Sequence, residues 1–188
     1  MFEALVRENG ARLGLVSPKD LPLLRSRHVL DSLRAVHAFG SGERRACDLG
    51  SGAGFPGVPL AIFLPDIRFV LCEPQQRLAG FLELAAERLA LENVEVFAGR
   101  VEALPDSFDL CTARAFGPLE RSWRASFPVL TPGGRLVYFA GRSLRDPEGA
   151  GRSLSDPEPP ATVASLEVLA NAPPLVIMTR EVNSHGDP

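Results

Sequence analysis

Several features common in other protein classes are scarce in this sequence, and each absence narrows what the chain can be. Only three cysteines occur among 188 residues, at Cys47, Cys72 and Cys111. Their spacing fits neither a zinc site nor a redox motif, so we expect small buried side chains in a reducing compartment. No apolar run approaches the roughly 18 residues of a membrane-spanning helix. The first eight residues also lack the basic-then-apolar design of a secretion signal. We therefore expect a cytoplasmic protein with no membrane partner.

An excess of positive charge is also missing. The 20 basic residues are outnumbered by 23 acidic ones, which gives a net charge of −3. No overall field attracts nucleic acid, so any RNA contact must come from a local patch. Lys19 is the only lysine, and the remaining positive charge comes from arginine, whose planar fork suits phosphate oxygens. The length allows one domain with a substantial core, and we expect a monomer.

The apolar pattern changes near residue 44. Before it, helices are expected at 2–13 and 20–37, which together would form a helical cap over residues 1–40. After it, short apolar runs alternate with helical patterns: strands at 45–49, 67–73, 94–98, 108–113 and 135–140, and helices at 57–64, 75–91 and 118–129. This alternation predicts an α/β domain over 41–188, with an open, mostly parallel sheet and helices on both faces.

The last quarter of the chain breaks this rhythm. The stretch Gly141–Glu148 nearly recurs as Gly151–Glu158, and its Gly, Ser, Pro and Asp content predicts a mobile surface loop over 142–160. Two final strands are expected at 162–169 and 175–180. They would form an antiparallel pair at the edge of the sheet.

A glycine-rich turn follows the first predicted strand and carries most of the functional information. It reads Asp48-Leu-Gly-Ser-Gly-Ala-Gly54, and Pro56 opens the next helix. Glycines at Gly50, Gly52 and Gly54 let the backbone turn sharply and approach a ligand closely. In open α/β sheets, ligands bind beyond the carboxyl ends of the strands. The turn therefore predicts a cofactor site.

Two cofactors compete for this turn. Residues 52–57 also satisfy the dinucleotide pattern G-x-G-x-x-G, with Glu73 at a distance suited to ribose binding. Asp48 favours the other cofactor, S-adenosylmethionine, because a carboxylate there can face a cationic sulfonium but would repel a pyrophosphate. If the carboxylate serves the ligand, Asp48→Ala should weaken donor binding with little loss of fold.

Three further positions are candidates at the ends of later strands. Glu73 could accept hydrogen bonds from two ribose hydroxyls, or it could simply be an acid at a helix N-terminus. Val101 and Glu102 could frame an adenine, or lie in an ordinary surface loop. Arg114 could contact a ligand or a phosphate, or form a salt bridge.

Four stretches together resemble the bacterial 16S ribosomal RNA guanine-N7 methyltransferases, formerly called glucose-inhibited division protein B. They are Arg27–Leu33, Asp48–Ile62, Gly99–Glu102 and Thr112–Phe116. The resemblance implies a class I, Rossmann-like methyltransferase fold, with a short N-terminal helical cap that helps to bind RNA. It implies S-adenosylmethionine contacts at Gly50, Phe55, Val101, Glu102 and Arg114, with an acid at the Glu73 position, and transfer to N7 of a guanine in 16S rRNA.

The chain departs from this pattern mainly on the substrate side. A lysine expected in the family before Arg77 is Gln76, and another expected at the end of the fifth strand is Ala140. The stretch that follows Gly141 is the duplicated loop rather than a helix. The donor site is thus better supported than the acceptor. A methyltransferase acting on another RNA or on a small molecule, and a non-catalytic donor-binding protein of the ribosome, remain alternatives, with a nicotinamide-dependent oxidoreductase as a minor one.

The expected substrate residues lie on the second predicted helix. Arg27, His28 and Asp31 are candidates there, with His28 and Asp31 either forming a dyad or bracing the cap against the domain. Arginines in and near this helix could contact phosphate or simply form a solvated charged face, which Asp31 and Glu43 interrupt: Arg25, Arg27, Arg34, Arg44 and Arg45. Guanine N7 carries a free lone pair, so transfer needs orientation and proximity rather than a catalytic base.

Overall fold

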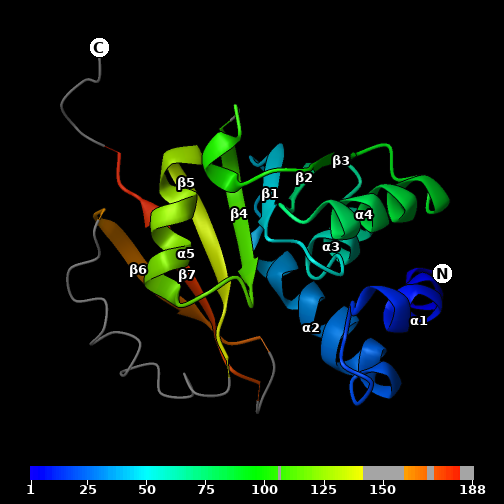
Figure 1. Ribbon diagram of the computed structural model, residues 1–188. Coiled ribbons are helices and arrows are strands. Elements are labelled where there is room, and N and C mark those ends of the chain that lie inside the picture. Colours follow the sequence, from blue (N-terminus) through cyan, green and yellow to red (C-terminus); the bar gives the residue numbers. More distant parts are fainter. Residues whose placement is uncertain (106, 142–158, 169–171, 183–188) are drawn as a thin grey trace.

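Seven strands form one sheet in the order β3-β2-β1-β4-β5-β7-β6 (Figure 1). The computed structural model describes residues 1–105, 107–141, 159–168 and 172–182. Strands β1 to β5 run parallel, whereas β7 runs antiparallel to both of its neighbours, β5 and β6. The open, mostly parallel sheet with an antiparallel edge pair is confirmed. The bounds are β1 Arg45–Leu49, β2 Arg68–Cys72, β3 Val94–Phe97, β4 Phe108–Arg114, β5 Leu130–Phe139, β6 Ala161–Leu166 and β7 Leu175–Arg180.

Alternate residues of the central strands face two different sets of helices, because successive side chains of a strand point to opposite faces. One face packs against α5 (Leu119–Ser126) and the short helices η4 (Val101–Ala103) and η5 (Phe127–Val129). The other packs against α3 (Gly57–Phe63), α4 (Gln76–Arg88) and the N-terminal helices. All three cysteines are free and buried on the α5 face, which confirms the expectation of small buried side chains.

The order of the strands turns back between β1 and β4. From β1 the chain moves outward to β2 and β3, then returns to place β4 on the other side of β1. The connections on the two sides of this point diverge to opposite faces of the sheet, which leaves a crevice beyond the carboxyl ends of β1 and β4. The glycine turn leaves β1 at this crevice.

The N-terminal helices are less regular than the sequence predicts. Helix α1 spans Phe2–Leu13 as expected and packs on α4. The helix expected at 20–37 is instead a chain of short pieces: η1 Leu21–Leu23, the π-helical η2 Leu24–Val29, α2 Leu30–Leu33 and η3 Arg34–Ala38. Leucines recur here at intervals of three, the period of a 3₁₀ helix rather than an α-helix, and Leu30 is 52% exposed. In Figure 1 these helices, in blue, lie beside α3 and α4.

Two expectations stay untested. The division into a cap over 1–40 and a domain over 41–188 remains a prediction. The repeated segment lies mostly at 142–158, outside the described residues, so the loop expected over 142–160 also remains a prediction. No helix in the described part of the chain is long and apolar enough to cross a membrane.

Candidate functional site

The glycine turn adopts a backbone that side chains would obstruct. Gly50, Gly52 and Gly54 have φ angles of 63°, 53° and 88°, in the left-handed region that favours glycine. A Cβ atom on Gly50 would lie 2.8 Å from Cδ2 of Phe116. The Ser51 amide donates to the carbonyl of Cys72 at 3.0 Å and ties the turn to the end of β2. The backbone can therefore approach a ligand here, as expected.

Asp48 lies under this turn rather than on its surface. The parallel register sets Asp48 beside Thr112 of β4, and the Thr112 hydroxyl donates to Asp48 Oδ1 at 2.7 Å. The amide of Gly57, at the start of α3, donates to Oδ2 at 3.2 Å. Only 1% of Asp48 is exposed, and burial raises the pKa of its carboxyl to about 6 despite these hydrogen bonds. The contacts contradict the expectation that Asp48 can be removed with little loss of fold, because an alanine would leave two buried donors unpaired.

Glu73 closes β2 and also contacts the turn. The amide of Gly52 donates to its Oε2 at 3.0 Å, and the amide of Gln75 donates to Oε1 at 2.9 Å. The carboxylate therefore both supports the glycine turn and accepts a hydrogen bond at the approach to α4. Each oxygen keeps a second lone pair for another donor, so ribose binding remains a prediction.

A cavity of about 290 Å³ lies over the glycine turn, and we call it the glycine-loop cavity. Its wall on the far side comes from the N-terminal segment, where the His28 ring packs against Phe55, with ring centroids 5.1 Å apart. Predicted donor and substrate residues thus meet in one place. The lining consists of Leu15, Val16, His28, Gly50, Ser51, Gly52, Ala53, Phe55, Arg114 and Ala115.

The predicted adenine residues lie apart from this cavity. Val101 and Glu102 are in η4, where Val101 is buried and Glu102 is exposed. Val101 belongs to the apolar cluster against which Phe116 packs, and the Phe116 ring covers Gly50. Val101 is therefore linked to the turn through Phe116, but the structure does not bring Val101 or Glu102 into the cavity itself.

Arg114 connects the end of β4 to the N-terminal segment. Its Nη2 donates to the carbonyl of Arg27 at 2.9 Å and lies 3.2 Å from Nδ1 of His28. Its Nε lies 3.5 Å from Asp31 Oδ2. The salt bridge considered for Arg114 is present. His28 and Asp31 both contact this arginine, as the bracing interpretation predicts; a ligand contact of Arg114 remains a prediction.

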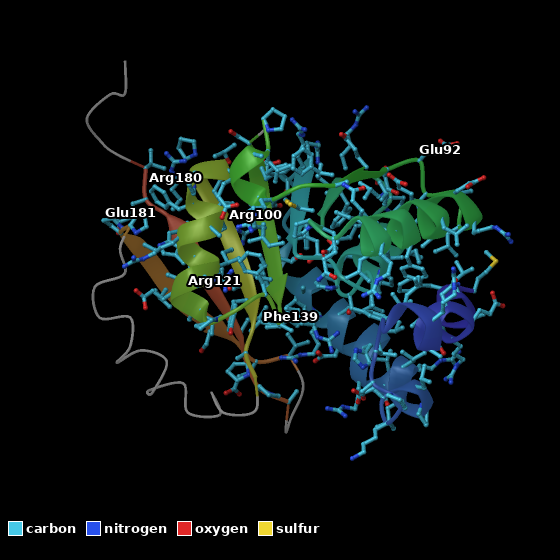
Figure 2. The ribbon with its side chains drawn as sticks, viewed as in Figure 1. Glu92, Arg100, Arg121, Phe139, Arg180 and Glu181 are labelled. Atoms are coloured by element: carbon cyan, nitrogen blue, oxygen red, sulfur yellow. The ribbon has the colours of Figure 1, made fainter. Side chains whose placement is uncertain are left out.

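A second cavity, of about 490 Å³, lies on the other side of this contact. It shares His28, Arg114 and Ala115 with the glycine-loop cavity and reaches the carboxyl end of β5, marked by Phe139 in Figure 2. Ala115 has a φ of 56°, an uncommon backbone for alanine that often occurs at functional sites. The other lining residues are Ser26, Arg27, Asp31, Arg34, Tyr138, Phe139, Ala140, Gly141, Ala172 and Pro173.

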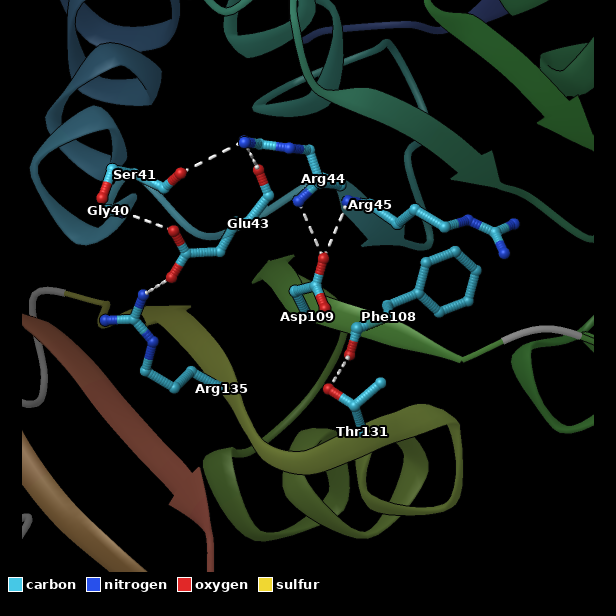
Figure 3. A network of polar contacts seen from close by, with 9 residues as sticks. All are labelled: Gly40, Ser41, Glu43, Arg44, Arg45, Phe108, Asp109, Thr131 and Arg135. Atoms are coloured by element: carbon cyan, nitrogen blue, oxygen red, sulfur yellow. Dashed lines mark hydrogen bonds and ion pairs between the residues drawn. The ribbon is translucent and has the colours of Figure 1, made fainter.

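Three of the arginines proposed for phosphate contact are buried or lie far from the glycine turn, and their contact with phosphate remains a prediction. Arg34 is only 5% exposed and donates to Asp31 and to the carbonyl of Pro173. Arg44 and Arg45 lie at the amino end of β1, where Asp109 accepts hydrogen bonds from both of their amides at 2.8 and 3.0 Å (Figure 3). Five strand residues, at about 3.3 Å each, separate that end from the glycine turn.

The other two candidates, Arg25 and Arg27, are exposed. Arg25 pairs with Glu3 at 2.9 Å, and Arg27 pairs with Asp20. Exposed ion pairs of this kind are weak, so both side chains remain available to an anion. Their contact with phosphate stays a prediction.

The sequence did not reveal several residues that hold the site together. Thr112 binds Asp48, Phe116 covers Gly50, and the Tyr138 hydroxyl donates to the carbonyl of Gly117 at 2.9 Å. Thr112 would have been the easiest of these to infer from the sequence, because its hydroxyl follows the apolar Leu110 and Cys111 near the carboxyl end of β4. Among the described residues, no cluster of His, Cys, Asp and Glu suits a metal ion.

Solved structures share this fold. A methyltransferase from Pyrococcus furiosus superposes with a TM-score of 0.62 at 15% sequence identity, covering 96% of this chain and 98% of the other. A SAM-dependent methyltransferase from Aquifex aeolicus superposes with a TM-score of 0.60 at 18% identity, covering 87% and 97%. At such low identity the likeness shows the fold alone, and that fold is the class I, Rossmann-like one that was expected.

Sequence relatives are closer. Ribosomal RNA small subunit methyltransferase G from Nocardioides sp. is 39% identical over 147 residues, and its counterpart from Salinispora arenicola is 38% identical over 151. These matches cover 77% and 76% of this chain but 58% and 62% of the relatives, so the chain spans about three fifths of their length. The family model GidB, described as rRNA small subunit methyltransferase G, matches residues 1–152. The chain therefore belongs to the GidB family.

Proposed function

We propose that this protein transfers a methyl group from S-adenosylmethionine to N7 of a guanine in the 16S rRNA of the small ribosomal subunit. The observation that carries the proposal is the match to the GidB family over residues 1–152. That range contains both the glycine turn and the N-terminal residues that meet it at Arg114. The relatives' names include small-subunit rRNA, and guanine N7 follows from the family resemblance of the motifs.

The residues around the glycine turn fit this donor. Gly50 and Gly52 give a ligand access to the backbone, and the glycine-loop cavity of about 290 Å³ is near the lower end of the range for small-molecule sites. Arg114 offers a cation for the carboxylate of the donor's amino-acid end. Glu73 offers lone pairs for the ribose hydroxyls, and the family resemblance assigns Val101 and Glu102 to the donor as well. When bound, the donor supplies an electrophilic methyl group on a sulfonium centre.

The chemistry asks little of the protein beyond alignment. N7 of guanine has a lone pair at neutral pH, so no side chain has to remove a proton. The protein's task is to hold the acceptor base next to the donor, in line with the methyl group, and such positioning accounts for a large part of the acceleration in two-substrate reactions. His28, Arg114 and Ala115 line both cavities, so ligands in the two would be neighbours.

One chain lines both cavities, and we propose that the protein acts as a monomer. We also propose that it acts in the cytoplasm, because the proposed substrate is ribosomal RNA. Both proposals rest on the proposed substrate and on the observation that residues of one chain line both cavities.

Transfer to RNA tests the proposal directly. Small ribosomal subunits, and naked 16S rRNA from cells lacking this methylation, are incubated with labelled S-adenosylmethionine, and nucleosides are identified by mass spectrometry. We expect label only in 7-methylguanosine from small-subunit RNA. Arg114→Ala should abolish it, and Gly80→Ala, in open space on α4, should not. No transfer to RNA in any assembly state, with the donor bound, would contradict the proposal and favour a non-catalytic donor-binding protein.

One observation favours a second candidate, a methyltransferase with another acceptor. The family's lysine at the end of β5 is Ala140 here, and Ala140 lines the second cavity. A cation expected near the acceptor is thus missing. Label in another RNA or in a small-molecule fraction, with none in small-subunit rRNA, would support this candidate.

A further inference from the structure

The loop between β4 and α5 has an uncommon backbone at the place where the two cavities meet. Ala115 lines both cavities and has a φ of 56°. A residue with a Cβ atom adopts this left-handed region only against a steric penalty, and such a conformation persists where the surrounding structure enforces it. The contacts on each side of Ala115 therefore show what holds the loop.

The loop is anchored both before and after Ala115. Before it, Arg114 is bound by the N-terminal segment. Two residues after it, the carbonyl of Gly117 accepts a hydrogen bond from the Tyr138 hydroxyl at 2.9 Å. The left-handed residue thus lies between one anchor on the N-terminal helices and one on β5.

Tyr138 reaches the loop from a well-packed part of the sheet. In the register of β5 it lies beside Ala113 of β4 and Val176 of β7, and only 7% of it is exposed. Burial raises the pKa of its phenol, so the hydroxyl keeps its proton at neutral pH and can donate. Because neighbours hold the ring on both sides, the hydrogen bond fixes Gly117 relative to the sheet.

The residue between these two points, Phe116, contacts the glycine turn. A Cβ atom on Gly50 would lie 2.8 Å from Cδ2 of the Phe116 ring, so the ring lies directly against the backbone of Gly50. Gly50 has a φ of 63° and belongs to the turn at which the donor is proposed to bind. The position of the loop therefore sets the position of the ring against that turn.

Resting on the proposed function, we propose that Tyr138 is a positioning residue for the methyl donor. Its hydrogen bond to Gly117 keeps the Phe116 ring on Gly50, and the ring keeps the glycine turn in the form that binds the donor. Tyr138 acts through the loop, because it lines the second cavity and not the glycine-loop cavity.

Calorimetric titration with S-adenosylhomocysteine tests this without methyl transfer. Tyr138→Phe removes only the hydroxyl, and the net contribution of one hydrogen bond corresponds to a factor of roughly 2–13 in an equilibrium. We therefore expect the Kd to rise about three- to tenfold. An unchanged Kd in this variant would overturn the proposal.

Thr131→Val is the matched control. The Thr131 hydroxyl also joins β5 to β4 through a carbonyl, that of Phe108 at 3.3 Å, but it does so at the amino ends of the two strands. Because distant sites act independently, its Kd should stay within about 1.5-fold of the wild-type value, whatever the change in Tm. An equal rise of the Kd in Thr131→Val and Tyr138→Phe would mean that the hydroxyl only stabilises the sheet, and would overturn the proposal.

NMR and a second substitution separate positioning from packing. A nuclear Overhauser effect between the Phe116 ring and the α protons of Gly50 should be present in the wild type and in Thr131→Val, and weaker in Tyr138→Phe. Adding Ala115→Gly to Tyr138→Phe should restore this signal and bring the Kd within about twofold of the wild type, because glycine adopts the left-handed region without strain. Lost packing would not be rescued in this way, so failure of the rescue would overturn the proposal.

A further variant decides if Tyr138→Phe does not fold. Phe116→Leu removes the ring and keeps the hydrogen bond to Gly117. Its Kd for S-adenosylhomocysteine should rise at least about threefold, by the same reasoning on the size of a single lost contact. An unchanged Kd would overturn the proposal, since the ring is the link between Tyr138 and the turn.

The two proposals fail in different assays. Absence of transfer to rRNA, with the Kd responding to Tyr138→Phe as described, contradicts the proposed function alone. Transfer to rRNA, with Tyr138→Phe binding S-adenosylhomocysteine as tightly as the wild type, contradicts this inference alone.

Discussion

The affinity for S-adenosylmethionine should rise with pH between 5 and 7, because Asp48 ionises in that interval. Burial raises the pKa of its carboxyl to about 6 from an ordinary value of 3.8. A cationic donor at the glycine turn favours the ionised carboxylate, so binding should return the pKa toward its ordinary value. Protonated Asp48 then disfavours binding, and the donor binds more tightly as the proton is lost.

The size of the effect follows from the two pKa values. At pH 5, with a pKa of about 6, roughly one tenth of the free protein is ionised at Asp48. If the bound form has a pKa near 4, affinity at pH 7 should be about ninefold higher than at pH 5. The raised pKa also makes the free energy of unfolding depend on pH. Because the carboxyl of Asp48 holds its proton more tightly in the folded protein, its contribution to the free energy of unfolding is fully present below pH 3.8 and is lost as the pH rises through 6. Each pKa unit is worth about 1.4 kcal/mol, so the loss is about 3 kcal/mol.

Calorimetric titrations at pH 5, 6, 7 and 8 with S-adenosylmethionine and S-adenosylhomocysteine measure the effect. The neutral thioether lacks the sulfonium charge and should show a smaller dependence on pH. Asp48→Asn is the matched variant: its amide oxygen can accept from Gly57 and its amide nitrogen can donate to Thr112, so the fold should persist. It also separates the effect of Asp48 from that of His28, which lines the glycine-loop cavity and has a lowered pKa. The same pH slope in Asp48→Asn as in the wild type would refute the reasoning.

Three further predictions concern the fold and the wall of the site. Gly57→Ala should lower the free energy of unfolding by about 2 kcal/mol in a denaturant titration, because its Cβ would lie 2.4 Å from Leu71 Cδ2 and 2.8 Å from Asp48 Oδ2. Gly80→Ala is the control: open space surrounds Gly80, so this variant should raise the free energy of unfolding by up to about 1 kcal/mol. Ala90→Gly should stabilise the protein by about 0.5–1 kcal/mol, because Ala90 follows α4 with a φ of 51°; a loss of stability would contradict the helix end described here. ¹⁵N NMR at pH 7 should show His28 protonated on Nε2 alone, with a pKa below 6.5 since burial lowers it; protonation on Nδ1 would contradict the contact with Arg114.

Much of the fold could be predicted because hydrophobic periodicity is a local signal. The bounds of α1, β1 and β7 match the expected ranges, and the other strands differ mainly at their ends. The prediction of one helix over 20–37 was wrong because a leucine spacing of three was interpreted as an α-helical face. The antiparallel edge pair was predicted, but the order of the five parallel strands could not be. It depends on which strands pair, and no residue of β1 or β4 specifies its neighbour.

The site was predictable in its residue types and not in its contacts. The glycine turn, Glu73 and Arg114 were found because parallel strands of an open sheet deliver their last residues to a common edge. Asp48 was assigned to the ligand, whereas its side chain is buried under the turn by a register with Thr112 that only the paired strands create. Arg44 and Arg45 are close to the turn in sequence but lie at the opposite end of β1. Proximity along the chain is a poor guide once a strand intervenes.

The boundary expected near residue 40 separates two folding patterns, but it does not separate two functions. The N-terminal segment supplies His28 to both cavities, the Arg27 carbonyl and Asp31 to Arg114, and Phe2 to the Phe55 ring, with centroids 5.1 Å apart. Without that segment the glycine-loop cavity would lose one wall and Arg114 would lose every partner described for its side chain. A cap that only gathered RNA could be exchanged without affecting the donor. This one holds Arg114, which lines both cavities, so ligands in the two cavities should affect each other's binding through that side chain.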